Sequence, residues 1–163
     1  MNKIIGTILL CFLLLSACAD APDFDSAPYI EFERMESNQI AQSSQKDTVY
    51  FVLYFEDGDG NLRPGDQGAN VFLMDLRDST IAFSFASPDI PREGSGNGVK
   101  GTLRLQAHIL KGDVCCLYET GQPPCTPSSP TRTDSLYYDL YLYDEAGNRS
   151  NTVKAGPIIL LCD

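Results

Sequence analysis

The chain has 163 residues, of which 12 are Lys or Arg and 22 are Asp or Glu, so its formal net charge is −10. An acidic chain of this kind lacks the basic face that a phosphate backbone or an anionic lipid surface requires, and we therefore expect no nucleic-acid partner. With 43% hydrophobic and 21% charged residues, the composition is that of one folded domain and excludes a chain that is disordered throughout.

The first 17 residues have the pattern of an export signal. Lys3 supplies a positive charge, and residues 4–15 form an apolar run that is shorter than the roughly 20 residues a membrane-spanning helix needs. The letters LSAC follow at residues 15–18, and they resemble the lipobox of bacterial lipoproteins. The resemblance implies cleavage before Cys18 and attachment of lipid to its thiol, which would anchor the protein in a membrane. The alternative is an ordinary signal peptide that happens to precede a cysteine.

Residues 18–27 follow the signal as an acidic tether that contains proline, and residues 28–163 remain as a single domain. In lipoproteins of the enteric type, an aspartate after the anchor cysteine favours the inner membrane, so Ala19 is compatible with the outer membrane. The acidic stretch also resembles the surface-export signals of Bacteroidetes lipoproteins, although a solvated linker has the same composition. We expect a cell-envelope protein anchored in the outer membrane, with periplasmic and surface-exposed orientations both open.

The next predicted elements are strands. Residues 48–55 are a dense run of β-branched and aromatic side chains that ends at an Asp-Gly turn, which is typical of a strand. Residues 102–109 and 136–143 alternate apolar and polar side chains, which predicts two strands with one buried face each. The side chains expected to face inward are Leu103, Leu105, Ala107 and Ile109 in one strand and Leu136, Tyr138, Leu140 and Leu142 in the other.

Four further candidate strands lie at residues 29–32, 70–75, 81–85 and 152–161. No window shows a helical stripe, so we predict an antiparallel β-sandwich of about seven strands.

Two turns carry a resemblance to known domains. The letters YDEAGNRS at residues 143–150 resemble the D-x-A-G-N-x-S turn near the end of bacterial immunoglobulin-like domains, where it links the last two strands. The letters FEDGDGNL at residues 55–62 resemble a stretch found in Bacteroidetes lipoproteins that have no established activity. The resemblance implies an immunoglobulin-like β-sandwich and leaves the activity open.

Four cysteines remain once the signal and the anchor are set aside: Cys115, Cys116, Cys125 and Cys162. An even number of cysteines in an exported protein favours disulfides. A bond between Cys115 and Cys116 would strain the ring between neighbours, so we expect one of them to pair with Cys125 and the other with Cys162. Neighbouring residues in a strand face opposite sides, which suits two different partners. A zinc site is the rival interpretation, but it would need four convergent ligands and no CxxC pair is present.

An acidic turn follows the run at residues 48–55 and offers oxygen ligands. Asp57, Asp59 and Asn61 occupy alternate positions, and Asp66 lies nearby in the sequence. Calcium takes 6–8 oxygen ligands, which side chains of this kind can supply. The turn is not an EF-hand, because Leu62 stands where that loop requires glycine and no helices flank it.

The strand order implied by the resemblance adds two residues to this candidate site. In an immunoglobulin order, the turn after residue 57 and the turn at residues 143–150 lie at the same pole of the sandwich. Asp144 and Asn148 would then meet Asp57, Asp59 and Asn61, and the five together are the predicted calcium ligands. The alternative is turn chemistry alone, because Asp-Gly pairs supply the hydrogen bonds and positive φ angles of tight turns.

His108 is the only histidine of the chain and falls on the polar face of its predicted strand. A general base needs a nucleophile or a water molecule positioned beside it. The glycine-rich residues 93–98 lack the G-x-S-x-G spacing of a nucleophile elbow. We therefore expect no catalysis, with a small carboxylate-based hydrolase as the remaining enzymatic alternative.

Three tyrosines lie on the predicted outward face of one strand, namely Tyr137, Tyr141 and Tyr143. Such a row offers rigid, amphipathic rings to a glycan or protein partner. A neighbouring loop that covers the row is the other interpretation and the one we favour. The sequence as a whole predicts a non-catalytic binding or adhesion module of the cell envelope, with a structural or assembly accessory of the outer membrane as the alternative.

Overall fold

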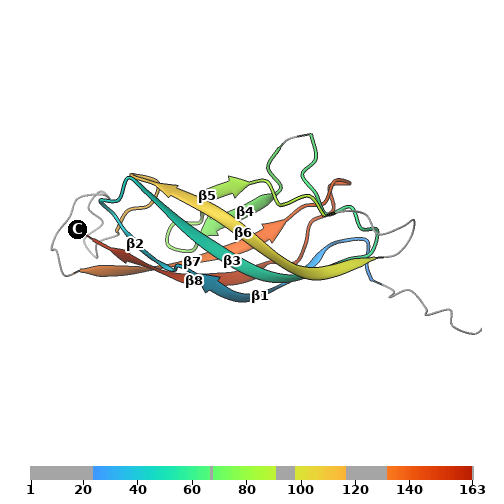
Figure 1. Cartoon of the computed structure of the whole chain (residues 1–163), viewed down its shortest axis with the longest axis horizontal. Helices are drawn as coiled ribbons and strands as arrows, with labels where there is room; N and C mark the ends of the chain where they lie inside the picture. The colour runs from blue at the N-terminus through green and yellow to red at the C-terminus, as the bar shows by residue number, and fades with distance from the viewer. Residues whose placement is uncertain (1–23, 67, 91–97, 117–131, 163) are drawn as a thin grey trace, which may run out of the picture.

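The computed structural model describes residues 24–66, 68–90, 98–116 and 132–162, and it contains only strands and loops in these ranges (Figure 1). The eight strands are β1 (Tyr29–Glu36), β2 (Gln39–Ala41), β3 (Lys46–Asp57), β4 (Val71–Asp75), β5 (Thr80–Phe85), β6 (Val99–Leu110), β7 (Thr133–Leu142) and β8 (Val153–Leu161). Nothing in the described ranges forms a helix with the length and apolar character needed to cross a membrane.

The strands form two sheets. One sheet has the order β1-β3-β6 and the other has the order β2-β8-β7-β4-β5. All neighbouring strands are antiparallel except β2 and β8, which run parallel. The sheets pack face to face, so the all-β sandwich predicted from the alternating pattern is confirmed.

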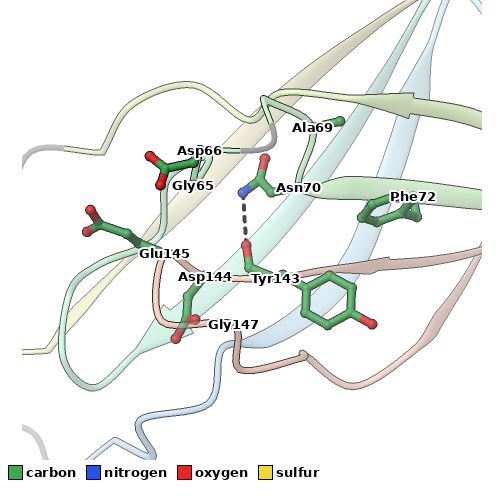
Figure 2. A pocket seen from close by; sticks show the side chains of 9 residues that line it. All are labelled: Gly65, Asp66, Ala69, Asn70, Phe72, Tyr143, Asp144, Glu145 and Gly147. Atoms are coloured by element: carbon green, nitrogen blue, oxygen red, sulfur yellow. Dashed lines mark hydrogen bonds between the residues drawn. The ribbon is translucent and has the colours of Figure 1, made fainter.

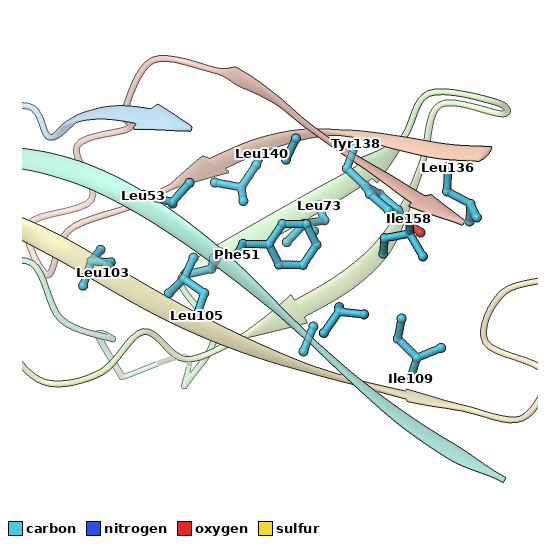
Figure 3. Close-up of a cluster of buried hydrophobic side chains, with 14 of the residues drawn as sticks. Phe51, Leu53, Leu73, Leu103, Leu105, Ile109, Leu136, Tyr138, Leu140 and Ile158 are labelled. Carbon is cyan, nitrogen blue, oxygen red and sulfur yellow. The ribbon is translucent and has the colours of Figure 1, made fainter. Parts of the chain in front are cut away.

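The core lies between the two sheets and follows the predicted alternation. All eight side chains expected to face inward from β6 and β7 are buried. Phe51 of β3 meets Tyr138 of β7 across the core in an edge-to-face contact, with ring centroids 6.4 Å apart (Figure 3). The period of two in the sequence therefore identifies which face of β6 and of β7 is buried.

The structure extends several predicted strands, so that β1 reaches Glu36, β3 spans Lys46–Asp57 and β6 spans Val99–Leu110. It adds β2, a three-residue strand in which only Ile40 is buried. A segment this short shows no period, so its pairing with β8 could not be predicted from pattern. At the end of β7, the strand stops at Leu142, and Tyr143 keeps only an isolated bridge to Arg149.

A disulfide joins Cys116 to Cys162 and fastens the segment after β6 to the end of β8. This confirms the prediction that one cysteine of the adjacent pair holds the last strand. Cys115 is disulfide-bonded as well, and Cys125, its expected partner, lies outside the described residues. Because Cys116 and Cys162 are bonded to each other, they are not zinc ligands.

The turn between β4 and β5 contains a half-buried ion-pair network. Arg77 forms hydrogen bonds with both carboxylate oxygens of Asp75, at 2.7–3.1 Å, and Nη1 of Arg77 lies 2.8 Å from Oδ2 of Asp134. The same Nη1 donates to the main-chain oxygen of Cys115 at 2.9 Å. Arg77 thus joins the second sheet to the segment that precedes the disulfide.

Replacing Tyr138 by phenylalanine should not lower the stability of the protein. We expect a free energy of unfolding between that of the wild type and about 1 kcal/mol above it. The ring of Tyr138 is fully buried in the core, and its hydroxyl has no hydrogen-bond partner among the described residues. An unsatisfied buried hydroxyl costs free energy that phenylalanine would not incur. Urea unfolding of the two proteins measures the difference, and a loss of more than about 1 kcal/mol would show that the hydroxyl is bonded in solution.

Candidate functional site

The candidate site lies at one end of the sandwich, which we call the loop pole and define as residues 24–28, the described part of 57–70 (57–66 and 68–70) and residues 143–152. In Figure 1 it is the end at which β1 and β8 begin and β3 terminates. The topology brings these three segments together although they are far apart in the sequence. This agrees with the prediction that the two turns lie at the same pole.

Three carboxylates meet at the loop pole, and we call them the acidic cluster: Asp57, Asp59 and Asp144. One oxygen of each lies within 4.8 Å of the others. Asp57 is the last residue of β3 and is 0% exposed, Asp144 is 3% exposed, and Asp59 is exposed to solvent. The cluster therefore opens to solvent on one side and is closed by the protein on the other.

Asp57 is the unusual member of this cluster. Neither of its carboxylate oxygens accepts a hydrogen bond from the part of the chain that the structure describes. Burial, and after it the neighbouring carboxyl of Asp59, raise the pKa of Asp57 to about 6, although the nearby main-chain amide of Asn61 acts to lower it. A buried carboxylate without donors is costly, so Asp57 lacks the partner that its charge requires.

Asn61 lies beside the cluster and has a similar feature. Its Nδ2 donates to Oδ2 of Asp59 at 2.8 Å. Its Oδ1 is buried and has no described hydrogen-bond donor. Asn61 therefore lies beside Asp59, as the sequence indicates. Its side-chain oxygen Oδ1 has no hydrogen-bond donor in the described ranges.

Asn148, another of the predicted ligands, forms hydrogen bonds with the carboxylate of Asp144. Its main-chain amide donates to Oδ1 of Asp144 at 2.7 Å, and its Nδ2 donates to Oδ2 of Asp144 at 2.8 Å. These bonds fix the carboxylate of Asp144 in the turn, where Gly147 supplies the positive φ of +86°. Asn148 thus holds Asp144 in position at the edge of the cluster.

The end of the predicted tether is part of the loop pole. The amide of Gly58 donates to the main-chain oxygen of Asp25 at 2.8 Å. A Cβ on Gly58 would collide with the main-chain oxygens of Phe24 and Asp25, so only glycine allows this approach. Nδ2 of Asn148 also lies 3.5 Å from the oxygen of Ser26. Residues 24–26 therefore pack against both acidic turns and do not form a free linker.

Two further bonds connect the acidic turns to each other. The amide of Glu145 donates to the main-chain oxygen of Asn61 at 3.2 Å. Arg63 forms an ion pair with the carboxylate of Glu145 at the surface, with Nη2 2.6 Å from Oε2. Asp66, the additional ligand considered from the sequence, is exposed and is not among the clustered carboxylates.

A pocket of about 600 Å³ lies beside the acidic cluster. Figure 2 shows the carboxylates of Asp66 and Glu145 on one side of it and the rings of Phe72 and Tyr143 on the other, with Asn70 between them. The remaining lining residues are Gly65, Ala69, Asp144 and Gly147. The pocket thus combines oxygen acceptors with apolar ring surface.

The rings continue from the pocket along the outer face of the second sheet. Phe72 of β4 stacks on Tyr141 of β7, and Tyr143 meets both rings edge to face. Arg149 lies over the ring of Tyr141 at 4.0 Å from its centroid. We call Phe72, Tyr141 and Tyr143 the aromatic cluster.

The predicted tyrosine row is therefore outward-facing but does not form one continuous platform. Tyr137, in the middle of β7, is 36% exposed and has Lys154 over its ring, 4.5 Å from the ring centroid. Arg149 therefore covers the ring of Tyr141 together with Phe72, and Lys154 covers the ring of Tyr137. The proline-rich loop that we expected to cover the row lies outside the described residues.

His108 lies on the outward face of β6, as expected from the alternation. Its Nδ1 is 3.1 Å from the hydroxyl of Thr48 on β3. Thr48 and His108 are register partners within the first sheet, whereas the acidic cluster lies at the pole where β3 ends. The structure therefore does not bring His108 together with the candidate site residues.

Two parts of the site were not predicted from the sequence. One is the contribution of Phe72 to the aromatic cluster, and the other is the pocket beside that cluster. Phe72 lies in a predicted strand, but the register of β4 with β7 is a non-local feature that one strand does not reveal. The predicted lipid-attachment residue Cys18 lies outside the described residues. The chain matches no protein-family model, no curated protein and no solved structure.

Proposed function

We propose that the protein is an exported, lipid-anchored component of the cell envelope that binds a neutral glycan and has no catalytic activity. Its immunoglobulin-like sandwich presents the pocket and the aromatic cluster to the ligand, and Cys18 carries the anchor in the outer membrane. The observation that carries the glycan proposal is the pairing of aromatic rings with carboxylate and amide groups around one pocket.

The order of the strands supports the immunoglobulin-like part of the proposal. If the eight strands are lettered A, A′, B, C, C′, E, F and G, the sheets have the orders A-B-E and A′-G-F-C-C′. An immunoglobulin-like domain has this division between its two sheets, with Greek-key connections. The turn at residues 143–150 lies between β7 and β8, which corresponds to the F–G position.

The chemistry of the pocket supports a sugar as the ligand. Sugar rings have apolar C–H faces that pack on aromatic side chains, and their hydroxyls donate hydrogen bonds to carboxylates. The carboxylates of Asp66 and Glu145 supply acceptors, while Phe72 and Tyr143 supply ring surface. The net charge of −10 would repel an anionic polysaccharide, which favours a neutral glycan.

The position of the tether is compatible with this function. Residues 24–26 enter the domain at the loop pole, so a lipid on Cys18 would place that pole nearest the membrane. The aromatic cluster lies on the outer face of the second sheet, along the side of the sandwich. A ligand would approach the pocket along this outer face.

The proposal is tested by binding of the full-length protein to immobilised neutral glycans. Phe72→Ala should weaken binding at least about tenfold, because it removes ring surface from the pocket. Tyr137→Ala is the matched control, since it removes an outward ring of the same sheet away from the pocket, and it should bind as the wild type does. Failure of the wild type to bind any neutral glycan, or unchanged binding by Phe72→Ala, would contradict the proposal.

A second candidate function is that of an envelope assembly accessory with a protein partner. The observation that favours it is apolar exposure around the edge strand β5, where Ile81 is 57% exposed and Leu76 is 38% exposed. Exposed apolar side chains on a sheet edge are typical of a contact with another protein. Co-purification of one stoichiometric partner that is lost in Ile81→Lys would favour this function over glycan binding.

A further inference from the structure

We propose that the acidic cluster and Asn61 form a binding site for one divalent cation of the calcium class. The proposal does not depend on the glycan: Asp144 is the one residue of the acidic cluster that also lines the pocket, and the test uses the metal alone. It rests on the spacing of the carboxylate oxygens and on the buried, unpartnered oxygens of Asp57 and Asn61.

The spacing of the oxygens fits a shared ion. Calcium–oxygen distances are about 2.3–2.6 Å, so two oxygens bound to the same ion are at most about 5 Å apart. The three carboxylates of the cluster each offer an oxygen within 4.8 Å of the others. Because Asp59 is exposed, water can complete the 6–8 ligands that calcium requires.

The second observation is the state of Asp57 and Asn61. Both oxygens of Asp57 and Oδ1 of Asn61 are buried and accept no hydrogen bond from the described residues. In the same part of the chain, none of the three clustered carboxylates forms an ion pair, and the nearby Arg63 is paired with Glu145. Buried charges in proteins are paired or bound to metals, so these oxygens indicate a cation.

Turn chemistry alone does not account for Asp57. An aspartate that builds a turn accepts hydrogen bonds from nearby amides, and Asp144 does so through both of its oxygens. Asp57 accepts none although it is more deeply buried. Its carboxylate is therefore available to a ligand that the described residues do not provide.

The donor set favours calcium over other cations. All donors are carboxylate or amide oxygens, which suit hard cations, and no histidine or cysteine of the described residues belongs to the cluster. The donors come from two loops that are open on one side, and calcium tolerates irregular geometry better than magnesium. One ion would link the β3–β4 turn, the β7–β8 turn and, through Gly58, the chain that enters from the tether.

The test is calorimetric titration of the full-length protein with calcium chloride, after chelator treatment and dialysis. We expect one ion per chain with a dissociation constant of about 10⁻⁴–10⁻³ M, the range of extracellular modules. Asp59→Asn should weaken binding at least about tenfold, because it removes one ligand charge from an exposed position that does not affect the core. Asp66→Asn is the matched control, since it removes an exposed carboxylate of the same pole outside the cluster, and its binding should stay within about twofold.

A thermal melt of the same proteins provides an independent readout. At 10 mM calcium the wild type and Asp66→Asn should melt a few degrees higher than in chelator, and Asp59→Asn should not. No saturable binding and no thermal shift in the wild type would overturn the proposal. Equal weakening in Asp59→Asn and Asp66→Asn would also overturn it, because it would show only general attraction to an acidic surface.

Discussion

Replacing Arg77 by methionine should lower the free energy of unfolding by about 3–5 kcal/mol, which is the cost of breaking a buried ion pair. The side chain of Arg77 is 17% exposed and that of Asp75 is 6% exposed. Without the guanidinium, the carboxylate of Asp75 would stay buried with its charge uncompensated, and the main-chain oxygen of Cys115 would lose a donor. The loss should therefore exceed that of an ordinary surface substitution.

The matched control for Arg77 is Arg34→Met. Arg34 pairs with Glu33 and Glu36, but its side chain is 58% exposed. Solvent screens such a pair, so this change should cost less than about 1 kcal/mol. Urea unfolding of both variants measures the two losses. Equal losses would show that the network at the β4–β5 turn is no more stabilising than a surface pair.

Replacing Asp57 by asparagine should change stability in opposite directions with and without calcium. In chelator the variant should be more stable than the wild type by about 1–3 kcal/mol, because it removes a buried charge without donors. The new amide can also donate to Asp59, which carries the charge next to it. With calcium, the wild type should gain stability and the variant should not, because the buried ligand is missing.

The advantage of the asparagine variant in calcium-free solution should depend on pH. The folded-state pKa of Asp57 is about 6, above the ordinary value of 3.8, so the folded state binds more protons than the unfolded state between these values. The wild type should therefore lose stability as pH rises from about 4 to about 6, and the difference from Asp57→Asn should be complete above pH 6. Chemical unfolding of the wild type and of Asp57→Asn at several pH values measures this difference in the free energy of unfolding. An asparagine variant that is less stable than the wild type in chelator at pH 7 would contradict this account.

The β-sandwich architecture could be predicted largely because the alternation of apolar and polar residues is a local feature of the sequence. Alternation along β6 and β7 identified the buried side chains, since the period of two follows from strand geometry. The meeting of Asp57 and Asp144 was also predictable, because the turns that carry them resemble those of one known strand order. The hairpin between β7 and β8 formed at the expected residues, where Gly147 has a positive φ.

The missed features depend on pairing between distant segments. Arg77 lies between two predicted strands, and its contact with Asp134 depends on how β4 lies against β7. The stacking of Phe72 on Tyr141 depends on the same register. The contact of Asp25 with Gly58 places the end of the tether in the domain, which no periodicity in residues 18–27 indicates.

Mass spectrometry of the protein purified from its own membranes tests most directly the claim that it is an anchored envelope component. We expect a polypeptide that begins at Cys18 and carries a diacylglycerol on the thiol, with the new amine acylated. The same measurement on Cys18→Ala should find no lipid. A wild-type chain that begins at Met1 with an unmodified Cys18 would contradict the account.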